Sequence, residues 1–234
     1  MISASSVFFA FLGGVLPAVL WLWFWLREDK AHPEPRPILI GTFIAGMLSV
    51  FLALFLERGL GYFVVSGTTL SIILWALIEE GAKFTAAYLA ALRLKSNDEP
   101  VDMMIYLITA ALGFAALENA FFLLTPFGTN NIAEGLVTGN LRFIGSSLLH
   151  VTASGIIGIF GAYAFCELKK RKRLLIAIGL VLATALHAFF NFFILHSDNN
   201  LFIIFGFVWV AVVILILFFE RVKDIDRTCV TNSS

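Results

Sequence analysis

Four stretches of this sequence place ionisable or amide side chains inside long apolar runs. The stretch "WALIEEGAKF", residues 75–84, carries two adjacent glutamates and a lysine, and "ALEN", residues 116–119, carries an acid and an amide. "HVTAS", residues 150–154, and "HAFFN", residues 187–191, each begin with histidine. Burying a charge in a bilayer costs at least about 2.5–3.5 kcal/mol, so such side chains are expected to face a polar interior and to have a function. The candidates are Glu79, Glu80, Lys83, Glu118, Asn119, His150, His187 and Asn191.

These residue types suit two kinds of peptide hydrolysis. Imidazole and carboxylate groups can bind Zn²⁺ and leave a position for water, whose pKa the metal lowers toward about 7. The ligands would then be His150, His187 and Glu118. Alternatively, Glu79 or Glu80 in an apolar pocket activates a water directly, and histidine and asparagine side chains hold the oxyanion. The sequence leaves open both the metal and the identity of the base.

Helical spacing predicts how these groups support one another. Glu79 and Lys83 are four residues apart and are expected to form an ion pair on one face, while Glu80 points about 100° away and stays free for other chemistry. Ser154 and Asn191 each follow a histidine by four residues and are expected to orient its ring. Each feature also has a purely structural interpretation, as an ion-pair staple, a packing histidine or interhelical hydrogen bonding.

Composition identifies the elements that hold these groups as membrane helices. The chain has 234 residues, of which 60% are hydrophobic and 14% are charged, and its formal net charge of zero gives no bias toward nucleic acid. A membrane-spanning helix needs about 20 residues. Seven intervals qualify, and they predict an all-α polytopic bundle of about seven to eight spans: residues 7–26, 38–56, 68–92, 102–124, 141–165, 174–195 and 201–220. We expect one transmembrane domain over residues 1–220, with the site helices at about 68–195, and a polar cytosolic tail at 221–234.

The polar groups share a depth in these predicted helices. At 1.5 Å per residue, Glu80 lies about 18 Å from the outer end of its helix, and Glu118 lies about 9 Å from its own. The same estimate gives about 14 Å for His150 and about 12 Å for His187. The sequence therefore predicts that four consecutive helices meet at one level in the outer half of the bilayer.

Basic residues predict the orientation. Thirteen Lys and Arg residues lie in one set of alternate intervals, whereas Arg58 and Arg142 lie in the other. Positive charge accumulates on the cytoplasmic side of a membrane. We expect an outside N-terminus and a cytosolic C-terminus in a multi-pass protein of the cell (inner or plasma) membrane.

The motifs "EEGAK", "GFAALEN", "HVTASGIIG" and "HAFFN" occur in this order and resemble the PrsW family of bacterial intramembrane proteases. The loop "EDKAHPEPRP" is also similar to that family's acidic, proline-rich loop, and the resemblance covers about residues 20–195. It implies a relative of the CAAX-prenyl-protease and bacteriocin-processing superfamily. It further implies cleavage of membrane-anchored substrates, such as anti-sigma factors, on the extracytoplasmic side. By position, the family's glutamate pair and basic partner are Glu79, Glu80 and Lys83, its acid and amide are Glu118 and Asn119, and its histidines are His150 and His187, the latter followed by Asn191.

Two other classes of function remain open from the sequence. One is a non-catalytic membrane scaffold on the same fold, although such a protein has no physical need to keep buried charges. The other is a proton-coupled transporter, in which glutamate and histidine form a relay. Transporters usually contain internal repeats and broken helices, and no duplicated motif is visible here. The sequence predicts neither the substrate nor the oligomeric state.

Overall fold

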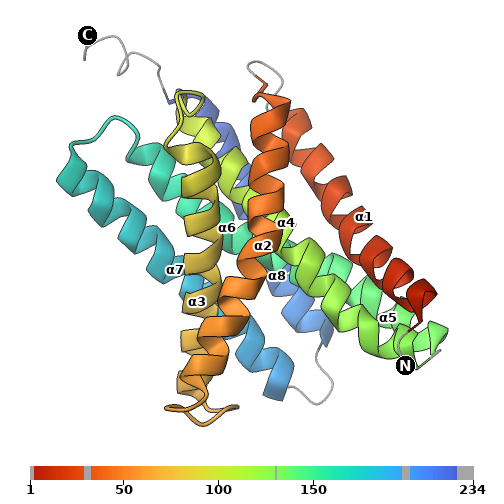
Figure 1. Ribbon diagram of the computed structural model, residues 1–234. Helices are drawn as coiled ribbons and strands as arrows, with labels where there is room; N and C mark the ends of the chain where they lie inside the picture. The colour runs from red at the N-terminus through yellow and green to blue at the C-terminus, as the bar shows by residue number, and fades with distance from the viewer. Residues whose placement is uncertain (1–2, 29–32, 130, 197–200, 226–234) are drawn as a thin grey trace.

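The computed structural model describes residues 3–28, 33–129, 131–196 and 201–225, and every regular element within them is helical (Figure 1). Two π-helical segments interrupt the α-helices: η1 (Tyr88–Leu92) continues α3, and η2 (Arg142–Ser146) joins α5 to α6. The α-helices are α1 (Ala4–Glu28), α2 (Arg36–Leu60), α3 (Thr69–Ala87), α4 (Pro100–Gly128), α5 (Ile132–Leu141), α6 (Ser147–Tyr163), α7 (Lys169–His196) and α8 (Leu201–Lys223). The all-α prediction is confirmed.

Six helices within the described residues are long and apolar enough to cross a membrane, with α5, η2 and α6 counted as one. Helix α3, which carries three charged residues, is not one of the six, although it lies among them in the bundle (Figure 1). Its start is well defined, because the Thr68 hydroxyl accepts a hydrogen bond from the Ser71 amide and Gly67 precedes it with a φ of 83°. Each predicted interval corresponds to one continuous helical stretch.

Two intervals between the predicted spans were expected to be loops, and that expectation was wrong because both contain helix. Residues 125–140 contain the end of α4 and all of α5 except its last residue, Leu141, and the start of α5 is capped by the Asn131 side chain accepting from the Glu134 amide. The basic run at 169–173 forms the first turns of α7, where Arg171 pairs with Glu167 one turn away. The predicted tail also starts too early, because residues 221–223 belong to α8, and residues 226–234 lie outside the described residues.

Helix α4 is the central element of the bundle (Figure 1). Every residue from Pro100 to Ala116 is buried, and α1, α2, α3 and α6 all pack against it. The contacts are close because glycines face α4: a Cβ on Gly14 of α1 would lie 2.3 Å from the Ala116 carbonyl oxygen. A Cβ on Gly113 of α4 would lie 2.0 Å from the Phe43 carbonyl oxygen of α2. Small residues permit such backbone contact between membrane helices.

Helices α3 and α6 pack against α4, and α7 packs on the outside of both. Helix α7 packs against both α3 and α6, and α3 also contacts α4 and α6. This arrangement brings Glu79 and Glu80 of α3, His150 of α6 and His187 of α7 to one level of the bundle, as their similar predicted depths indicated.

Candidate active site

Helix α3 contributes a buried carboxylate–ammonium pair. The Lys83 ammonium donates to Glu80 Oε1 at 2.5 Å, and both side chains are fully buried. The predicted pair between Glu79 and Lys83 was therefore wrong, as was the prediction that Glu80 stays free. On a helix the i,i+3 and i,i+4 positions are both within reach, so the rotation of α3 against its neighbours selects Glu80 as the partner.

His187 is held between the two glutamates. Its Nδ1 lies 2.7 Å from Glu80 Oε1, and its Nε2 lies 3.6 Å from Glu79 Oε2. A carboxylate can only accept, so Nδ1 carries the proton, and the Nε2 lone pair is left without a donor because Glu79 Oε2, 3.6 Å away, is itself an acceptor. Glu80 therefore fixes both the tautomer and the direction of this ring.

His150 makes contacts through both ring nitrogens. The Lys83 ammonium lies 2.9 Å from Nδ1, and Glu118 Oε2 lies 3.1 Å from Nε2. An ammonium has only donors, so Nδ1 is the acceptor and Nε2 donates to the carboxylate. The rings of His150 and His187 meet edge to face with their centroids 5.2 Å apart.

A guanidinium that the sequence interpretation assigned to a loop lies in the site. Arg142, at the start of η2, donates to Glu118 Oε2 and, at 2.5 Å, to Asn119 Oδ1. Asn119 in turn donates to the Ser147 hydroxyl at 3.0 Å. Counting Arg142 as a loop residue was wrong because α5, η2 and α6 form one helical stretch across the predicted boundary. The signal that was available is its place one residue inside the predicted span 141–165.

The two residues that were expected to orient the histidine rings, Ser154 and Asn191, do not hydrogen-bond to those rings. The Ser154 hydroxyl donates to Glu80 Oε2 at 3.2 Å rather than orienting His150. Asn191 is half-buried, and its side chain makes no hydrogen bond to any part of the chain that the structure describes. The prediction that Asn191 supports the His187 ring was wrong, because Glu80 from α3 holds that ring instead.

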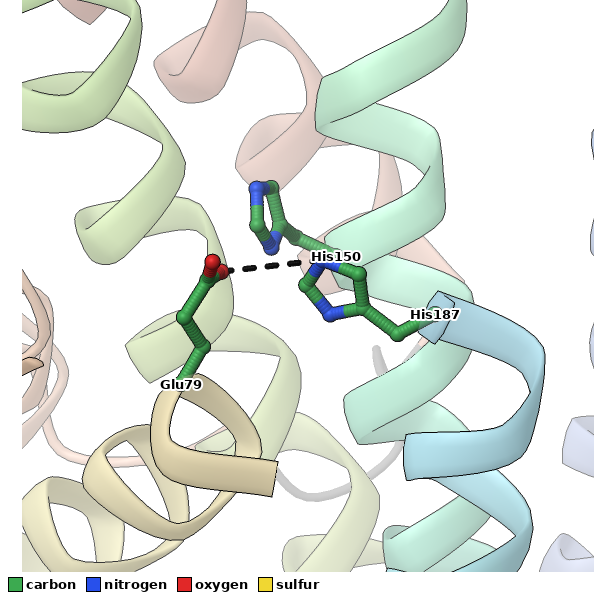
Figure 2. A group of neighbouring side chains, drawn as sticks. All are labelled: Glu79, His150 and His187. Carbon is green, nitrogen blue, oxygen red and sulfur yellow. Dashed lines mark ion pairs between the residues drawn. The ribbon is translucent and has the colours of Figure 1, made fainter. Parts of the chain in front are cut away.

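Glu79 completes the cluster with an oxygen, Oε2, that accepts no hydrogen bond and whose one basic neighbour within ion-pair distance among the described residues is His187 at 3.6 Å. Its carboxylate points toward the imidazoles of His150 and His187, which come from α6 and α7 (Figure 2). One ligand atom from each of these three residues lies within 4.8 Å of the others, and Glu79 Oε2 is buried without a hydrogen-bond partner. A buried acceptor with no donor is costly, so this oxygen is available to a ligand, a water or a metal ion.

Comparison with known proteins agrees with this arrangement. A family model described as "PrsW family intramembrane metalloprotease" matches residues 34–218. The chain belongs to the PrsW family. It is an intramembrane protease and a multi-pass membrane protein.

Curated relatives named "Protease PrsW" match over most of their length. The protein of Geobacillus kaustophilus is 29% identical over 188 residues, which are 80% of each chain. That of Clostridioides difficile is 29% identical over 192 residues, or 79% of each. That of Halalkalibacterium halodurans is 27% identical over 210 residues, covering 85% of this chain and 91% of its own. No solved structure matches.

The PrsW-family site has a donor set that fits Zn²⁺. Two histidines and a glutamate are a known ligand set for catalytic zinc, and Glu80 behind His187 provides the carboxylate that commonly holds a ligating imidazole. The unpaired Glu79 Oε2 is the structural observation in favour of this fit. His150 fits once one of its nitrogens is released by Lys83 or Glu118. Glu118 lies outside the three-residue group and pairs with Arg142, so its predicted role as a ligand stays a prediction.

A further carboxylate near the PrsW-family site was missed by the sequence interpretation. Glu57, at the end of α2, is close enough to interact electrostatically with both Glu79 and Glu118. It was assigned to the loop after the second span because that predicted span ends at residue 56, whereas α2 continues to Leu60. The side chains of Glu118 and Arg142 are 20% and 16% exposed, so this side of the cluster is the more accessible one.

Proposed function

We propose that this protease hydrolyses peptide bonds in membrane-anchored proteins, with Glu79 as the group that accepts the proton of the attacking water. The observation that carries the proposal is the buried, unpaired Glu79 Oε2, 3.6 Å from the Nε2 of His187. Glu80 is less suited to this role, because Lys83, His187 and Ser154 all contact its two oxygens. Glu80 is therefore assigned as a positioning residue.

In the proposed reaction, Glu79 takes a proton from water as the water oxygen attacks the carbonyl carbon of the substrate. The bond between carbonyl carbon and nitrogen then breaks, and the proton passes to the leaving nitrogen. His187, held by Glu80, is placed to orient the attacking water, which donates a hydrogen bond to its Nε2. If Zn²⁺ is bound, Glu79, His187 and His150 would be the side chains that hold it, so Glu79 would act as a ligand rather than as the base, and the metal would supply Lewis-acid polarisation and a lower pKa of the water.

Lys83 and Arg142 supply the positive charge of the site. Lys83 is shared between Glu80 and His150, and Arg142 anchors Glu118 and Asn119. The predicted role of Asn119 in holding substrate or oxyanion is less suited to its contacts, because both its amide oxygen and its amide nitrogen are already paired. We assign Asn119 to the positioning of Arg142.

The proposed cleavage site lies toward the extracytoplasmic side. Its residues lie nearer to the bundle end at which α2 ends and α3 begins, and the positive charge at the opposite end supports placing that opposite end in the cytosol. The plasma membrane is the proposed location. The family resemblance supports single-span regulatory proteins, such as anti-sigma factors, as the class of substrate.

The test is a comparison of protein termini in the membranes of cells that make the wild-type chain or Glu79→Gln at equal amounts. We expect new N-termini within or just outside the outer half of predicted membrane segments, and only with the wild-type chain. Identical sets of termini in the two membranes would contradict the proposal. New termini confined to cytosolic domains would contradict the proposed depth and orientation.

The metal content of the purified protein distinguishes zinc-dependent hydrolysis from hydrolysis with glutamate as the base. The geometry of Glu79, His150 and His187 leads us to expect about one Zn²⁺ per purified chain, measured by elemental mass spectrometry. His150→Ala and His187→Ala should each remove it, whereas His196→Ala, on the exposed end of α7, should not. Zinc retained in both site variants would contradict the ligand assignment.

A further inference from the structure

A groove between α3 and α7 runs beside the site. Its volume is about 670 Å³, and its walls are almost entirely apolar. On α3 it extends from Thr69, the first residue of the helix, to Leu77, and on α7 from Phe193 to Val181. It therefore begins at the bundle end where α3 starts and descends along both helices.

The groove reaches the level of the catalytic side chains. Leu77 precedes Glu80 by three residues and Thr184 precedes His187 by three, so each lies about one helical turn from a site residue. Ala188, which also lines the groove, is the immediate neighbour of His187. A chain lying in the groove would thus pass about one helical turn from Glu80 on α3 and beside the backbone of α7 that carries His187.

Thr184 points to the kind of ligand that the groove takes. Its side chain is 7% exposed, it lines the groove, and its hydroxyl has no hydrogen-bond partner. Threonines within membrane helices ordinarily bond the carbonyl one turn earlier, as Thr109 does to Ile105 at 2.7 Å and Thr152 to Leu148 at 2.6 Å. An unpaired hydroxyl in an apolar wall is costly unless a ligand supplies the partner.

A second apolar cavity provides a comparison for the α3–α7 groove. It lies between α6, α7 and α8, has a volume of about 600 Å³ and is similarly apolar. Its threonine, Thr152, is already bonded within its own helix. The three residues of the candidate metal group line neither cavity, but α3, the helix that carries Glu79 and Glu80, forms one wall of the α3–α7 groove and no wall of the second cavity. An acyl chain needs only apolar walls, which both cavities offer, whereas a buried threonine hydroxyl without a partner lies on the wall of the α3–α7 groove and not on that of the second cavity.

We propose that the α3–α7 groove binds an apolar membrane segment of the substrate protein, and that the Thr184 hydroxyl hydrogen-bonds its main chain near the bond to be cleaved. This inference rests on the proposed proteolytic function. A peptide bond must leave the helical conformation to be attacked, and its freed N–H and C=O groups have no water to bond within the bilayer. Thr184 supplies one such partner about one turn from His187, and the apolar walls cover the neighbouring side chains.

Photocrosslinking tests the occupant. The photoreactive residue p-benzoylphenylalanine would replace Val181, which lines the α3–α7 groove, or its neighbour Leu182, which lines the second cavity. The probe is a biotinylated single-span peptide of about 20 leucines and alanines with a Gly-Gly pair in its outer third and terminal lysines. Protein and probe would be reconstituted together in phospholipid vesicles, in the wild-type and Glu79→Gln backgrounds.

We expect the peptide adduct at position 181 to exceed that at 182 at least fivefold in both backgrounds. Equal yields at the two positions, or only phospholipid adducts at 181, would overturn the docking proposal and assign the groove to lipid. If the wild type cleaves the probe without an adduct at 181, the proteolytic function stands and the docking site is wrong. If the adduct forms at 181 and wild type leaves the probe intact, the docking site stands and the proteolytic proposal loses support.

The kinetics of probe cleavage test the role of Thr184 separately. Thr184→Val keeps the shape and removes the hydroxyl, so we expect the KM for probe cleavage to rise about fivefold with kcat changed less than twofold, as for one lost hydrogen bond. Thr184→Ser should restore the wild-type KM, and Thr152→Val, which faces the second cavity, should leave it unchanged. A wild-type KM in Thr184→Val, or the same rise in Thr184→Ser, would refute the hydrogen bond to substrate.

Discussion

Glu79→Gln is expected to lower the rate of substrate cleavage at least about 100-fold, because an amide can neither accept the proton of the attacking water nor act as an anionic ligand. The wild-type Oε2 is buried and unpaired, so the change breaks no hydrogen bond and the protein should fold normally. The measurement is the initial rate of cleavage of a membrane-anchored substrate in proteoliposomes, with the thermal unfolding midpoint as a check of folding.

Two other glutamates give this prediction its controls. Glu134→Gln makes the same chemical change on the exposed face of α5 and should leave the rate unchanged. Glu80→Gln should reduce the rate about 10- to 100-fold by loosening His187, and it should also destabilise the protein because Lys83 loses its partner. Full activity in Glu79→Gln, with a larger loss in Glu80→Gln, would reverse the roles assigned to the two residues.

Lys83→Met is expected to lower the free energy of unfolding by about 3–5 kcal/mol. Glu80 is fully buried, and removal of one partner of a buried ion pair leaves an uncompensated charge in a medium of low dielectric constant. The double variant Glu80→Gln/Lys83→Met removes both charges and should recover at least about half of this loss. Reversible unfolding in mixed micelles, followed by circular dichroism, measures both variants.

A surface lysine provides the matched control. Lys223 pairs with Glu220 at 2.7 Å and with Glu28 at 3.7 Å but is 27% exposed, so Lys223→Met should cost less than about 1 kcal/mol. Equal losses for Lys83→Met and Lys223→Met would show that the Lys83 charge contributes no more than a surface ion pair. An additive double variant would show that Glu80 and Lys83 are not energetically coupled.

The sequence predicted most of the residues that come together in the site, but it did not predict most of the ion pairs and hydrogen bonds between them. Glu80, His150 and His187 had similar predicted depths in separate helices, and the structure brings them into contact. Glu57 was missed because it lies near the end of α2, where hydropathy gives the boundary only to within a few residues. Arg142 was missed because it lies at the edge of a predicted span, whereas the helical stretch continues through that edge into α5. Asn191 was included for its spacing from His187, but spacing along one helix does not show that a neighbouring helix has already supplied the partner.

The sequence by itself determined the long apolar helices, their order and the level at which the polar groups lie. Apolar runs of membrane length and the cost of burying charge act along each helix separately, so they can be evaluated without knowing its neighbours. Only the tertiary structure decided that Lys83 pairs with Glu80, that Arg142 holds Glu118 and that Glu79 keeps an unpaired oxygen beside His187. One residue corresponds to about 100° of helix rotation, and that rotation is set by packing between helices, as at the glycine contacts of α4 with α1 and α2.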